Sequence, residues 1–479
     1  MPHIRIFGHY IHTPFLIMGV IEGALIVAGV FLAYWWRFDT LSSARGLALF
    51  PAALAYAAIV LVAMLAMGVY ESHVREGYSG MILRTAVAVF MIGSLGAAIL
   101  LYLVPEVLRL GRGTLALAAI ASFVLIIVFR IPVLQLLNQE ALKRRILVLG
   151  TGRRAAKIAF RMRRRYDQRS CAIVGYLPID SDAGVVTEAG GRVIQSNEPL
   201  PLFCRNHHID EIVVAIDERR RRDKGGAGLP LDALMECRML GIDVCDVQSF
   251  IERETGKLDV DLLQQSWVVF GDGFVHNRWR TASKRVFDLL VSSLLLLVSL
   301  PLIVVTILCI WVEGGFRGPI LYRQMRVGLD GVPFEVAKFR SMRADAEADG
   351  KAVWAQRDDP RITRVGAVMR RMRIDELPQL LNVLKGEMSF VGPRPERPEF
   401  VEDLEPEIPY YAHRHRIKPG LTGWAQLCYP YGASLDDAKE KLQYDLYYLK
   451  NHSLLLDLII LMQTVDVVLA GPERMAASM

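Results

Sequence analysis

The chain has 479 residues, of which 53% are hydrophobic, and its formal net charge is +6. At about 100–200 residues per domain, this length predicts two or three folded units together with membrane segments. The charge is small for the length, and Lys and Arg cluster after residue 140, so the composition favours anionic lipid or phosphate partners over nucleic acid. The six cysteines form no CxxC pair, which argues against a disulfide framework or a zinc site.

Four apolar runs in the first third of the chain are long enough to cross a bilayer, namely residues 14–35, 47–69, 85–104 and 114–135. Their short connections predict an antiparallel four-helix bundle over residues 1–138. Basic residues follow the fourth run at Lys143, Arg144 and Arg145, and the positive-inside rule makes this side cytoplasmic. Glu22 lies within the first run, where it is either a functional carboxylate or a hydrogen-bonded helix contact.

Residues 145–270 predict a cytoplasmic α/β Rossmann-like domain. Strand-like segments at 145–149, 172–177, 211–216 and 241–244 alternate with helical ones, which favours a parallel sheet. A Gly-x-Gly-x-x-Ala turn at 150–155 follows the first strand, as in dinucleotide-binding folds. Asp180 and Asp182 follow about 28 residues later, beyond the usual ~20. We therefore favour a nucleotide-binding fold used structurally or for regulation over a redox site.

A fifth apolar segment at residues 284–313 contains Pro301, with Ser299 two positions before it. One interpretation is a kinked spanning helix. The other is a re-entrant hairpin, which enters and leaves the membrane by the same face and would explain the basic residues on both flanks. Pro301 removes a helical hydrogen bond, and Ser299 can help to satisfy the freed backbone groups. We favour the hairpin, which places residues 314–470 in the cytoplasm beside the α/β domain.

The segment 314–470 contains a dense series of basic and acidic residues. Lys338 and Arg340 alternate in an extended stretch and so share one face, which suits a diphosphate or is only an exposed strand face. An amphipathic helix rich in arginine follows Thr363, as expected of a helix at a membrane surface. The last segment, residues 454–470, is predicted as an interfacial helix, with a core-facing helix as the close alternative.

Asp375 and Glu376 stand at the end of this basic run, three and two residues before Pro378. Proline is tolerated in a first helical turn, so a new helix is predicted there, ending at Gly386, with Asp375 as its N-cap. Alternatively, one carboxylate is a nucleophile toward phosphorus and the other binds Mg²⁺. The spacing leaves both interpretations open.

Several motifs together resemble the polyprenyl-phosphate hexose-1-phosphate transferases, which initiate bacterial exopolysaccharide, capsule and O-antigen assembly. The resemblance covers residues 284–470 through GPILYRQMRVG, KFRSM, DDPRITRVG, RIDELPQLLNVLKGEMSFVGPRP and KPGLTGWAQ, in this order. Four spans before a nucleotide-binding-like domain are similar to the larger form of the family. The family often has Ser directly before the hairpin proline, whereas Leu300 intervenes here.

The resemblance implies transfer of hexose-1-phosphate from a UDP-hexose to undecaprenyl phosphate, with release of UMP, at the cytoplasmic face of the bacterial inner membrane. It implies Asp375 as the nucleophile that carries the phosphosugar and Glu376 as the Mg²⁺ ligand. The implied phosphate-binding residues are Lys338, Arg340, Arg361, Arg373 and Arg394. The larger form favours glucose or galactose over an N-acetylated sugar, and a homodimer is left open.

Two other functions compete with this one. A membrane-tethered nucleotide-sugar dehydratase or epimerase would use the turn at 150–155, but the α/β segment contains no Tyr-x-x-x-Lys pair. A non-catalytic membrane scaffold is the second rival, and the retention of Asp375, Glu376 and Arg394 together speaks against it.

Overall fold

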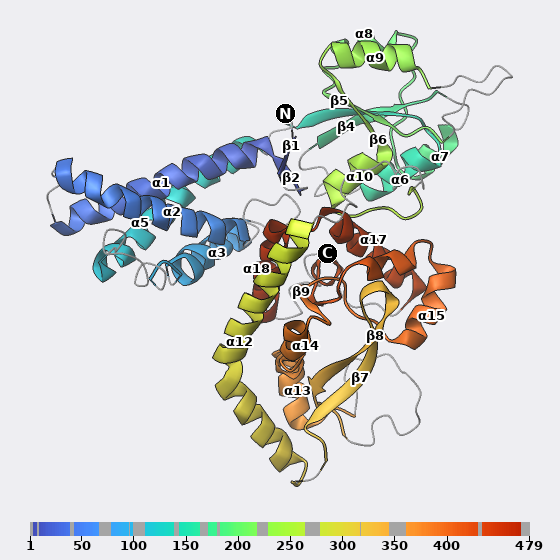
Figure 1. Ribbon diagram of the computed structural model, residues 1–479. Coiled ribbons are helices and arrows are strands. Elements are labelled where there is room, and N and C mark those ends of the chain that lie inside the picture. Colours follow the sequence, from blue (N-terminus) through green and yellow to red (C-terminus); the bar gives the residue numbers. More distant parts are fainter. Residues whose placement is uncertain are drawn as a thin grey trace. The chain divides into compact units, whose positions relative to one another are not determined.

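The structure is a computed structural model of the protein (Figure 1). It describes residues 3–6, 9–38, 43–66, 78–94, 96–98, 111–137, 143–162, 171–179, 183–217, 229–263, 278–316, 318–343, 361–429 and 434–470. The chain divides into two compact units, residues 1–6 with 10–256 and residues 7–9 with 257–479. Residues 257–263, which the sequence placed in the α/β domain, therefore lie in the second unit.

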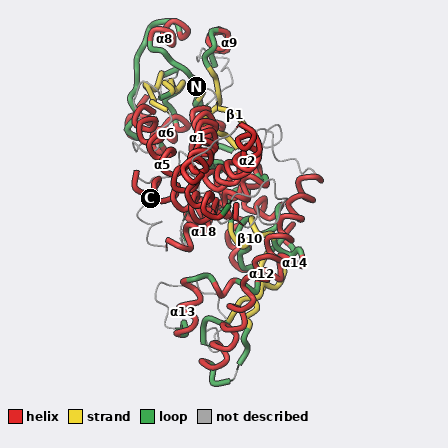
Figure 2. The backbone as a smooth tube through the Cα atoms, turned by 90° about the vertical axis from the view of Figure 1, so that its left-hand side faces the viewer, coloured by secondary structure: helices red, strands yellow, loops and turns green. Residues whose placement is uncertain are grey.

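The first unit begins with a short hairpin and a bundle of apolar helices. Its elements are β1 (His3–Ile6), β2 (His9–His12), α1 (Thr13–Phe38), α2 (Ser43–Ala66), α3 (Tyr78–Ala86), the π-helix η1 (Val87–Gly93) and α5 (Arg112–Leu137). Helix α1 packs against α5 and α2, and all three remain helical along their length (Figure 2).

Three described helices are long and apolar enough to span a bilayer, with spans at Ile17–Phe38, Arg112–Val133 and Arg278–Glu313. The first two coincide with predicted spans. The run at 47–69 corresponds to a shorter apolar helix, Leu49–Leu65, and the run at 85–104 lies partly outside the described residues. The bundle is therefore helical and apolar, while its four-span count stays a prediction.

A buried ion pair joins the bundle helices. The Arg130 guanidinium on α5 binds both carboxylate oxygens of Glu22 on α1, with Nε 2.7 Å from Oε1, and its Nη1 donates to Thr85 Oγ1 at 2.9 Å. All three side chains are buried. Glu22 is thus a hydrogen-bonded helix contact, which is the second of the two interpretations. Its partner Arg130 was not identified from the sequence.

The rest of the first unit is the predicted α/β domain. Four parallel strands lie in the order β4-β3-β5-β6, which confirms the parallel sheet. Helices α8 and α9 cover one face, and α6, α7 and α10 the other (Figure 1). The bounds are β3 (Arg144–Leu149), α6 (Arg153–Arg161), β4 (Cys171–Leu177), α7 (Ala183–Glu188), α8 (Leu200–Asn206), β5 (Glu211–Val214), α9 (Leu231–Met239), β6 (Asp243–Asp246) and α10 (Val247–Thr255).

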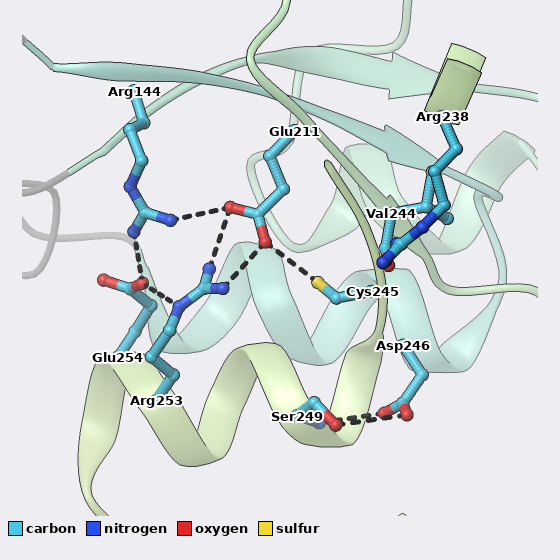
Figure 3. A network of polar contacts seen from close by, with 9 residues as sticks. All are labelled: Arg144, Glu211, Arg238, Val244, Cys245, Asp246, Ser249, Arg253 and Glu254. Carbon is cyan, nitrogen blue, oxygen red and sulfur yellow. Dashed lines mark hydrogen bonds and ion pairs between the residues drawn. The ribbon is translucent and has the colours of Figure 1, made fainter. Parts of the chain in front are cut away.

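A buried network of alternating charges ties α10 to the sheet (Figure 3). Glu211 at the start of β5 accepts from Arg144 at 2.9 Å and lies 2.8 Å from Arg253 on α10. Glu254 accepts from the same two arginines at 2.7 and 2.9 Å. Because two cations and two anions share these contacts, no described charge in the network is left uncompensated, which is the condition for burying ions.

The Gly-rich turn of this domain is closed by a carboxylate of the chain itself. Asp217, just after β5, accepts hydrogen bonds from the backbone N–H groups of Arg153 and Arg154 at 2.7 and 2.9 Å. A Cβ at Gly152 would lie 2.3 Å from the same carboxylate. Asp217 therefore occupies the N-terminus of α6, where a dinucleotide phosphate would bind. Asp180 and Asp182 lie outside the described residues.

The second unit contains the long helix α12 and a compact domain. Its elements are α12 (Arg278–Glu313), β7 (Leu321–Val327), η4 (Leu329–Gly331), β8 (Pro333–Phe339), α13 (Arg364–Arg371), η5 (Ile374–Glu376), α14 (Gln379–Lys385), β9 (Ser389–Val391), α15 (Pro398–Glu407), η6 (Tyr411–Arg416), β10 (Gly420–Thr422), α16 (Trp424–Cys428), α17 (Leu435–Asn451) and α18 (Leu454–Ala470). Strands β7 and β8 are antiparallel, while β9 and β10 are parallel.

The predicted hairpin segment is α12, which runs through Pro301 as one helix of 36 residues and bends about midway along its length (Figure 1). At ~1.5 Å per residue it is about 54 Å long, more than the ~30 Å of a hydrocarbon core. Pro301 lacks the N–H that would bond to the Leu297 carbonyl, and the Ser299 hydroxyl donates to the Leu295 carbonyl at 2.7 Å instead, a contact that often bends a helix. The re-entrant course of this segment therefore stays a prediction.

The polar start of α12 docks into the compact domain. The Lys284 ammonium donates to the Val391 carbonyl at 3.0 Å and pairs with Asp457 on α18 at 2.7 Å, and Arg285 donates to the Val383 and Leu384 carbonyls at the end of α14. Lys284 and Arg285 therefore bind groups of the protein, and their positive charge is weaker evidence for membrane topology than the sequence analysis took it to be. Asp457 is buried, which supports the core-facing interpretation of α18.

Candidate active site

Three separate segments bring charged side chains together in the second unit. Strand β8 contributes Lys338, the turn η5 contributes Asp375 and Glu376 with Arg373 before them, and the loop after β9 contributes Arg394. We call these five residues the carboxylate cluster. Each was a candidate from the sequence. The structure brings Lys338, Arg373 and Arg394 within 3.6 Å of Glu376, and Asp375 precedes Glu376 in the same turn.

The turn that carries the carboxylates is set by unusual backbone. The backbone of Arg373 has φ of +57°, a left-handed conformation that residues other than Gly rarely adopt. Such conformations are concentrated at functional sites. Gly366 on α13 approaches the Ser341 carbonyl so closely that a Cβ would lie 2.0 Å from its oxygen. Arg370 then donates to the Ser341 hydroxyl at 2.9 Å. Helix α13 is thereby held against the end of β8, and the reversal at Arg373 turns η5 back toward Lys338.

Glu376 is the anion that the cations of the cluster share. Its carboxylate oxygens lie 3.4 Å from Lys338 Nζ, 3.4 Å from Arg373 Nη1 and 3.6 Å from Arg394 Nη2. Burial alone would raise the pKa of Glu376, but Lys338, Arg394 and Arg373 outweigh it and lower the pKa to about 2. Glu376 is therefore ionised throughout the physiological range.

Asp375 is placed next to Glu376 but in a different environment. It is buried, and its Oδ1 has no hydrogen-bond partner among the described residues. Burial raises the pKa of Asp375 above its usual range, and the charge of Glu376 adds to this rise, while Lys338, Arg370 and Arg373 oppose it. A poorly solvated, more basic carboxylate with a free oxygen is suited to attack an electrophile.

The expected helix cap is wrong. Helix α14 begins at Gln379 with Pro378 at the N-cap, whereas Asp375 lies in the separate turn η5 and caps nothing. Proline can occupy an N-cap without loss, because the backbone donors at a helix start have no partner within the helix. The stabilisation of negative charge therefore comes from the cationic side chains and not from a helix N-terminus. Gly386, with φ of +90°, ends α14 as predicted.

Lys338 is held in place by an amide on the neighbouring helix. Asn382 on α14 donates to the Glu335 carbonyl at 2.7 Å and accepts from the Ala337 N–H at 3.4 Å, so it clamps the backbone of β8 just before Lys338. Burial lowers the pKa of the Lys338 ammonium, while Glu376 works against this effect. Lys338 is thus a poorly hydrated cation aimed at the carboxylates.

The other two predicted phosphate ligands are placed by different contacts. The guanidinium of Arg340, just past the end of β8, packs beside Gly318, where a Cβ would lie 2.3 Å from Nη1. Arg361 precedes the bridge between Met342 and Ile362 and accepts from the Arg343 N–H at 3.0 Å. No contact described in this domain joins Arg340 to the carboxylates.

Two further arginines belong to this region and were not singled out. Arg326 on β7 donates to the Pro395 carbonyl at 3.1 Å, and burial together with the nearby charge of Arg394 lowers its pKa to about 10. Arg370 contributes to the field on Asp375. The sequence did not distinguish these two residues, because both lie in arginine-rich stretches where a buried arginine cannot be told from an exposed one.

The carboxylate pair has the oxygen donors that Mg²⁺ prefers in proteins. The described residues contain no group of three or more His, Cys, Asp or Glu placed to hold a metal ion. Mg²⁺ in phosphoryl-transfer sites nevertheless needs only one or two carboxylates, since substrate phosphate and water supply the remaining ligands. The cationic contacts of Glu376, at 3.4–3.6 Å, are longer than the ~2.8 Å of strong ion-pair hydrogen bonds. The unpaired Asp375 Oδ1 and the loosely held Glu376 therefore fit such a site.

The fold and the site define a membrane-associated protein with a buried carboxylate pair among cationic side chains. Residues 279–471 match the family described as bacterial sugar transferase, and residues 65–222 match the CoA-binding domain family.

Three relatives illustrate the similarity. The UDP-N-acetylgalactosamine-undecaprenyl-phosphate N-acetylgalactosaminephosphotransferase of Aeromonas hydrophila is 39% identical over 250 residues, which are 52% of this chain and 58% of that protein. A UDP-glucose:undecaprenyl-phosphate glucose-1-phosphate transferase from Caulobacter vibrioides is 42% identical over 184 residues, 38% of this chain and 68% of its own length. Its namesake in Xanthomonas campestris pv. campestris is 28% identical over 474 residues, 96% of this chain and 94% of its own. This chain belongs to the bacterial sugar transferase family.

Proposed function

We propose that this protein is an undecaprenyl-phosphate sugar phosphotransferase, which moves hexose-1-phosphate from a UDP-sugar to undecaprenyl phosphate and releases UMP. The names of the relatives support this donor and acceptor, although the chain spans less than two thirds of the Aeromonas relative. The observation that carries the proposal is the opposite environment of Asp375 and Glu376 within one cationic cluster.

In the first step an Asp375 carboxylate oxygen attacks the sugar-bearing phosphorus of the UDP-sugar. A bond forms between this oxygen and phosphorus, and the bond from phosphorus to the bridging oxygen breaks, so that UMP leaves with the electron pair. The cations Lys338, Arg373 and Arg394 face the charge that develops on the phosphate oxygens. Arg340 and Arg361 stay candidates for binding the distal part of the nucleotide.

In the second step a phosphate oxygen of undecaprenyl phosphate attacks the same phosphorus. The bond to Asp375 breaks, the carboxylate is regenerated, and the sugar leaves on a polyprenyl diphosphate. Glu376 is the proposed ligand of Mg²⁺, which when bound offsets the charge of the diphosphate. Glu376 also holds the three cationic side chains in position between the two steps, because its lowered pKa leaves it ionised throughout.

We place the reaction at the cytoplasmic face of the bacterial inner membrane, where a soluble UDP-sugar and a lipid phosphate can meet. The apolar helices α1, α5 and α12 support membrane attachment. A re-entrant course for α12 stays part of this proposal. The rival dehydratase or epimerase function is disfavoured by Asp217, which fills the turn that a dinucleotide would need.

The sugar is a separate question. Relatives with similar identity act on N-acetylgalactosamine in one case and glucose in the other, by their names. We retain the expectation of glucose or galactose from the larger form, and a panel of UDP-sugars decides it.

The proposal is tested with the purified full chain in lipid nanodiscs, given undecaprenyl phosphate, Mg²⁺ and each UDP-sugar in turn. We expect UMP release with at least one sugar, and its loss on addition of EDTA. Asp375→Asn should abolish release, while Asp330→Asn, an exposed aspartate paired with Arg416 in the same domain, should not. Release of UDP instead of UMP, or full turnover by Asp375→Asn, would refute the proposed chemistry.

A further inference from the structure

The loop that carries Arg394 is held almost entirely through its carbonyl groups. Pro393 and Pro395 have no N–H to donate, so half of the usual backbone contacts are missing on either side of Arg394. Four successive carbonyls accept hydrogen bonds instead. Pro393 O accepts from Gly420 N at 2.8 Å, Arg394 O from Arg414 Nη2 at 3.1 Å, Pro395 O from Arg326 Nη1 at 3.1 Å, and Glu396 O from Val327 N at 2.9 Å.

The contact from Arg414 is the one that holds Arg394 itself. Arg414 lies on η6, and only 6% of its side chain is exposed. Its Nε and Nη2 donate to Asp445 Oδ2 at 3.1 and 2.8 Å, and its Nη1 donates to the Tyr411 hydroxyl at 2.8 Å. Asp445 lies on α17, so the guanidinium links the loop to a buried helix of 17 residues.

A guanidinium can make these contacts together because its donors diverge from a rigid plane. A lysine in the same place would keep the charge opposite Asp445 but would offer one compact ammonium group. It could not reach Asp445, Tyr411 and the Arg394 carbonyl with the same directions. The contact is therefore specific to arginine and is not only a matter of charge.

We propose that Arg414, anchored by Asp445, is a positioning residue that fixes the Arg394 guanidinium for the substrate diphosphate. Arg414 is buried and acts through the Arg394 carbonyl, whereas the Arg394 side chain is partly exposed and lies 3.6 Å from Glu376. This inference rests on the proposed function for the identity of the anion, and it adds a residue to which neither the sequence motifs nor the family comparison assigns a role.

The test is a double-mutant cycle on the full chain in nanodiscs, with two readouts. The first is the dissociation constant of UDP measured by calorimetry, and the second is kcat/KM for UMP release. Arg414→Lys should weaken UDP binding and lower kcat/KM by about 10- to 100-fold, the range for a displaced substrate-positioning group. In the Arg394→Ala background the same substitution should change both by less than twofold, because the side chain on which it acts is gone.

Lys257 provides the matched control. It is a buried cation that pairs with Glu440 of the same helix α17 at 2.8 Å. Lys257→Gln and Arg394→Ala should act independently. The fold-changes in UDP binding and in kcat/KM that the two single variants show should therefore multiply in the double variant. If Arg414→Lys fails to fold, Tyr411→Phe replaces it, since it removes one partner of Arg414 and keeps the arginine.

The inference would be overturned if the fold-changes of Arg414→Lys and Arg394→Ala multiplied fully in the double variant. Unchanged UDP binding in Arg414→Lys would also overturn it. Absence of UDP binding by the wild-type chain would overturn it as well, since no diphosphate would then be held by Arg394. Normal UDP binding without UMP release would refute the proposed function alone, so the two failures are distinguishable.

Discussion

Glu376 offers the sharpest test of the electrostatics of the site, through the substitution Glu376→Gln. The amide keeps the shape of the side chain but removes the anion shared by Lys338, Arg373 and Arg394. A fall in the pKa from 4.5 to about 2 corresponds to about 3 kcal/mol of stabilisation of the ionised form. We therefore expect Glu376→Gln to lower the stability of this domain by about 3 kcal/mol at pH 7.

The sign of the pH dependence follows from the direction of the shift. Because the folded-state pKa of Glu376 is below the unfolded value, its contribution is complete above about pH 4.5 and is lost as the pH falls toward 2. The difference between wild type and Glu376→Gln should therefore be constant from pH 7 to 5. It should shrink to roughly half at pH 3 by the same linkage relation.

The assay is thermal unfolding of the full chain in nanodiscs, following the transition of the second unit. For a region of about 200 residues, 3 kcal/mol corresponds to a fall of about 6–12 °C in Tm. Glu335→Gln is the control, because Glu335 and its partner Arg323 are both largely exposed and such pairs contribute roughly 0–1 kcal/mol. A Tm for Glu376→Gln equal to that of the control, or a gap that does not narrow on acidification, would refute the reasoning.

Three further outcomes are expected. Glu22→Gln should cost about 3–5 kcal/mol, because Arg130 would stay buried without its counter-charge, and a melting curve within 2 °C of wild type would contradict this. Asp217→Ala should weaken the start of α6 by about 1 kcal/mol, seen as faster hydrogen exchange at the Arg153 and Arg154 amides. Since burial raises the pKa of Asp375, kcat/KM should rise with pH with a midpoint above 3.8, and a midpoint below this value would count against Asp375 as the nucleophile.

Local patterns in the sequence predicted the local structure well. The strands of the α/β domain, the end of α14 at Gly386 and the spans in α1 and α5 all follow from periodicity and from Gly or Pro at element ends. The motifs around Asp375 and Arg394 identified five residues that the structure brings together. The strands and element ends succeeded because each depends on neighbours within a few residues, whereas the five site residues were identified through the family resemblance of their motifs.

Contacts between distant segments could not be read in the same way. The Glu22–Arg130 pair joins residues 108 positions apart, and the Asp217 contact with α6 spans more than 60. In both cases the sequence shows one polar residue among many, and only the packing of the helices or strands selects its partner. Arg414 was missed for the same reason, since its role depends on a carbonyl 20 residues away and a carboxylate 31 residues away.

The environment of the two adjacent carboxylates supports the proposal that one site holds both a nucleophile and an anion that stays ionised. Asp375 and Glu376 share the same turn and both feel the charges of Lys338 and Arg373, yet their pKa values move in opposite directions. Glu376 has three cations within 3.6 Å, and these overcome the cost of its burial. Asp375 is buried without such pairing, and the charge of Glu376 makes its ionised form less stable and more basic. In the proposed reaction an arriving phosphorus centre would relieve this penalty, because bond formation removes the negative charge from the Asp375 oxygen. Under this proposal Glu376 favours the attack of Asp375 through its charge alone.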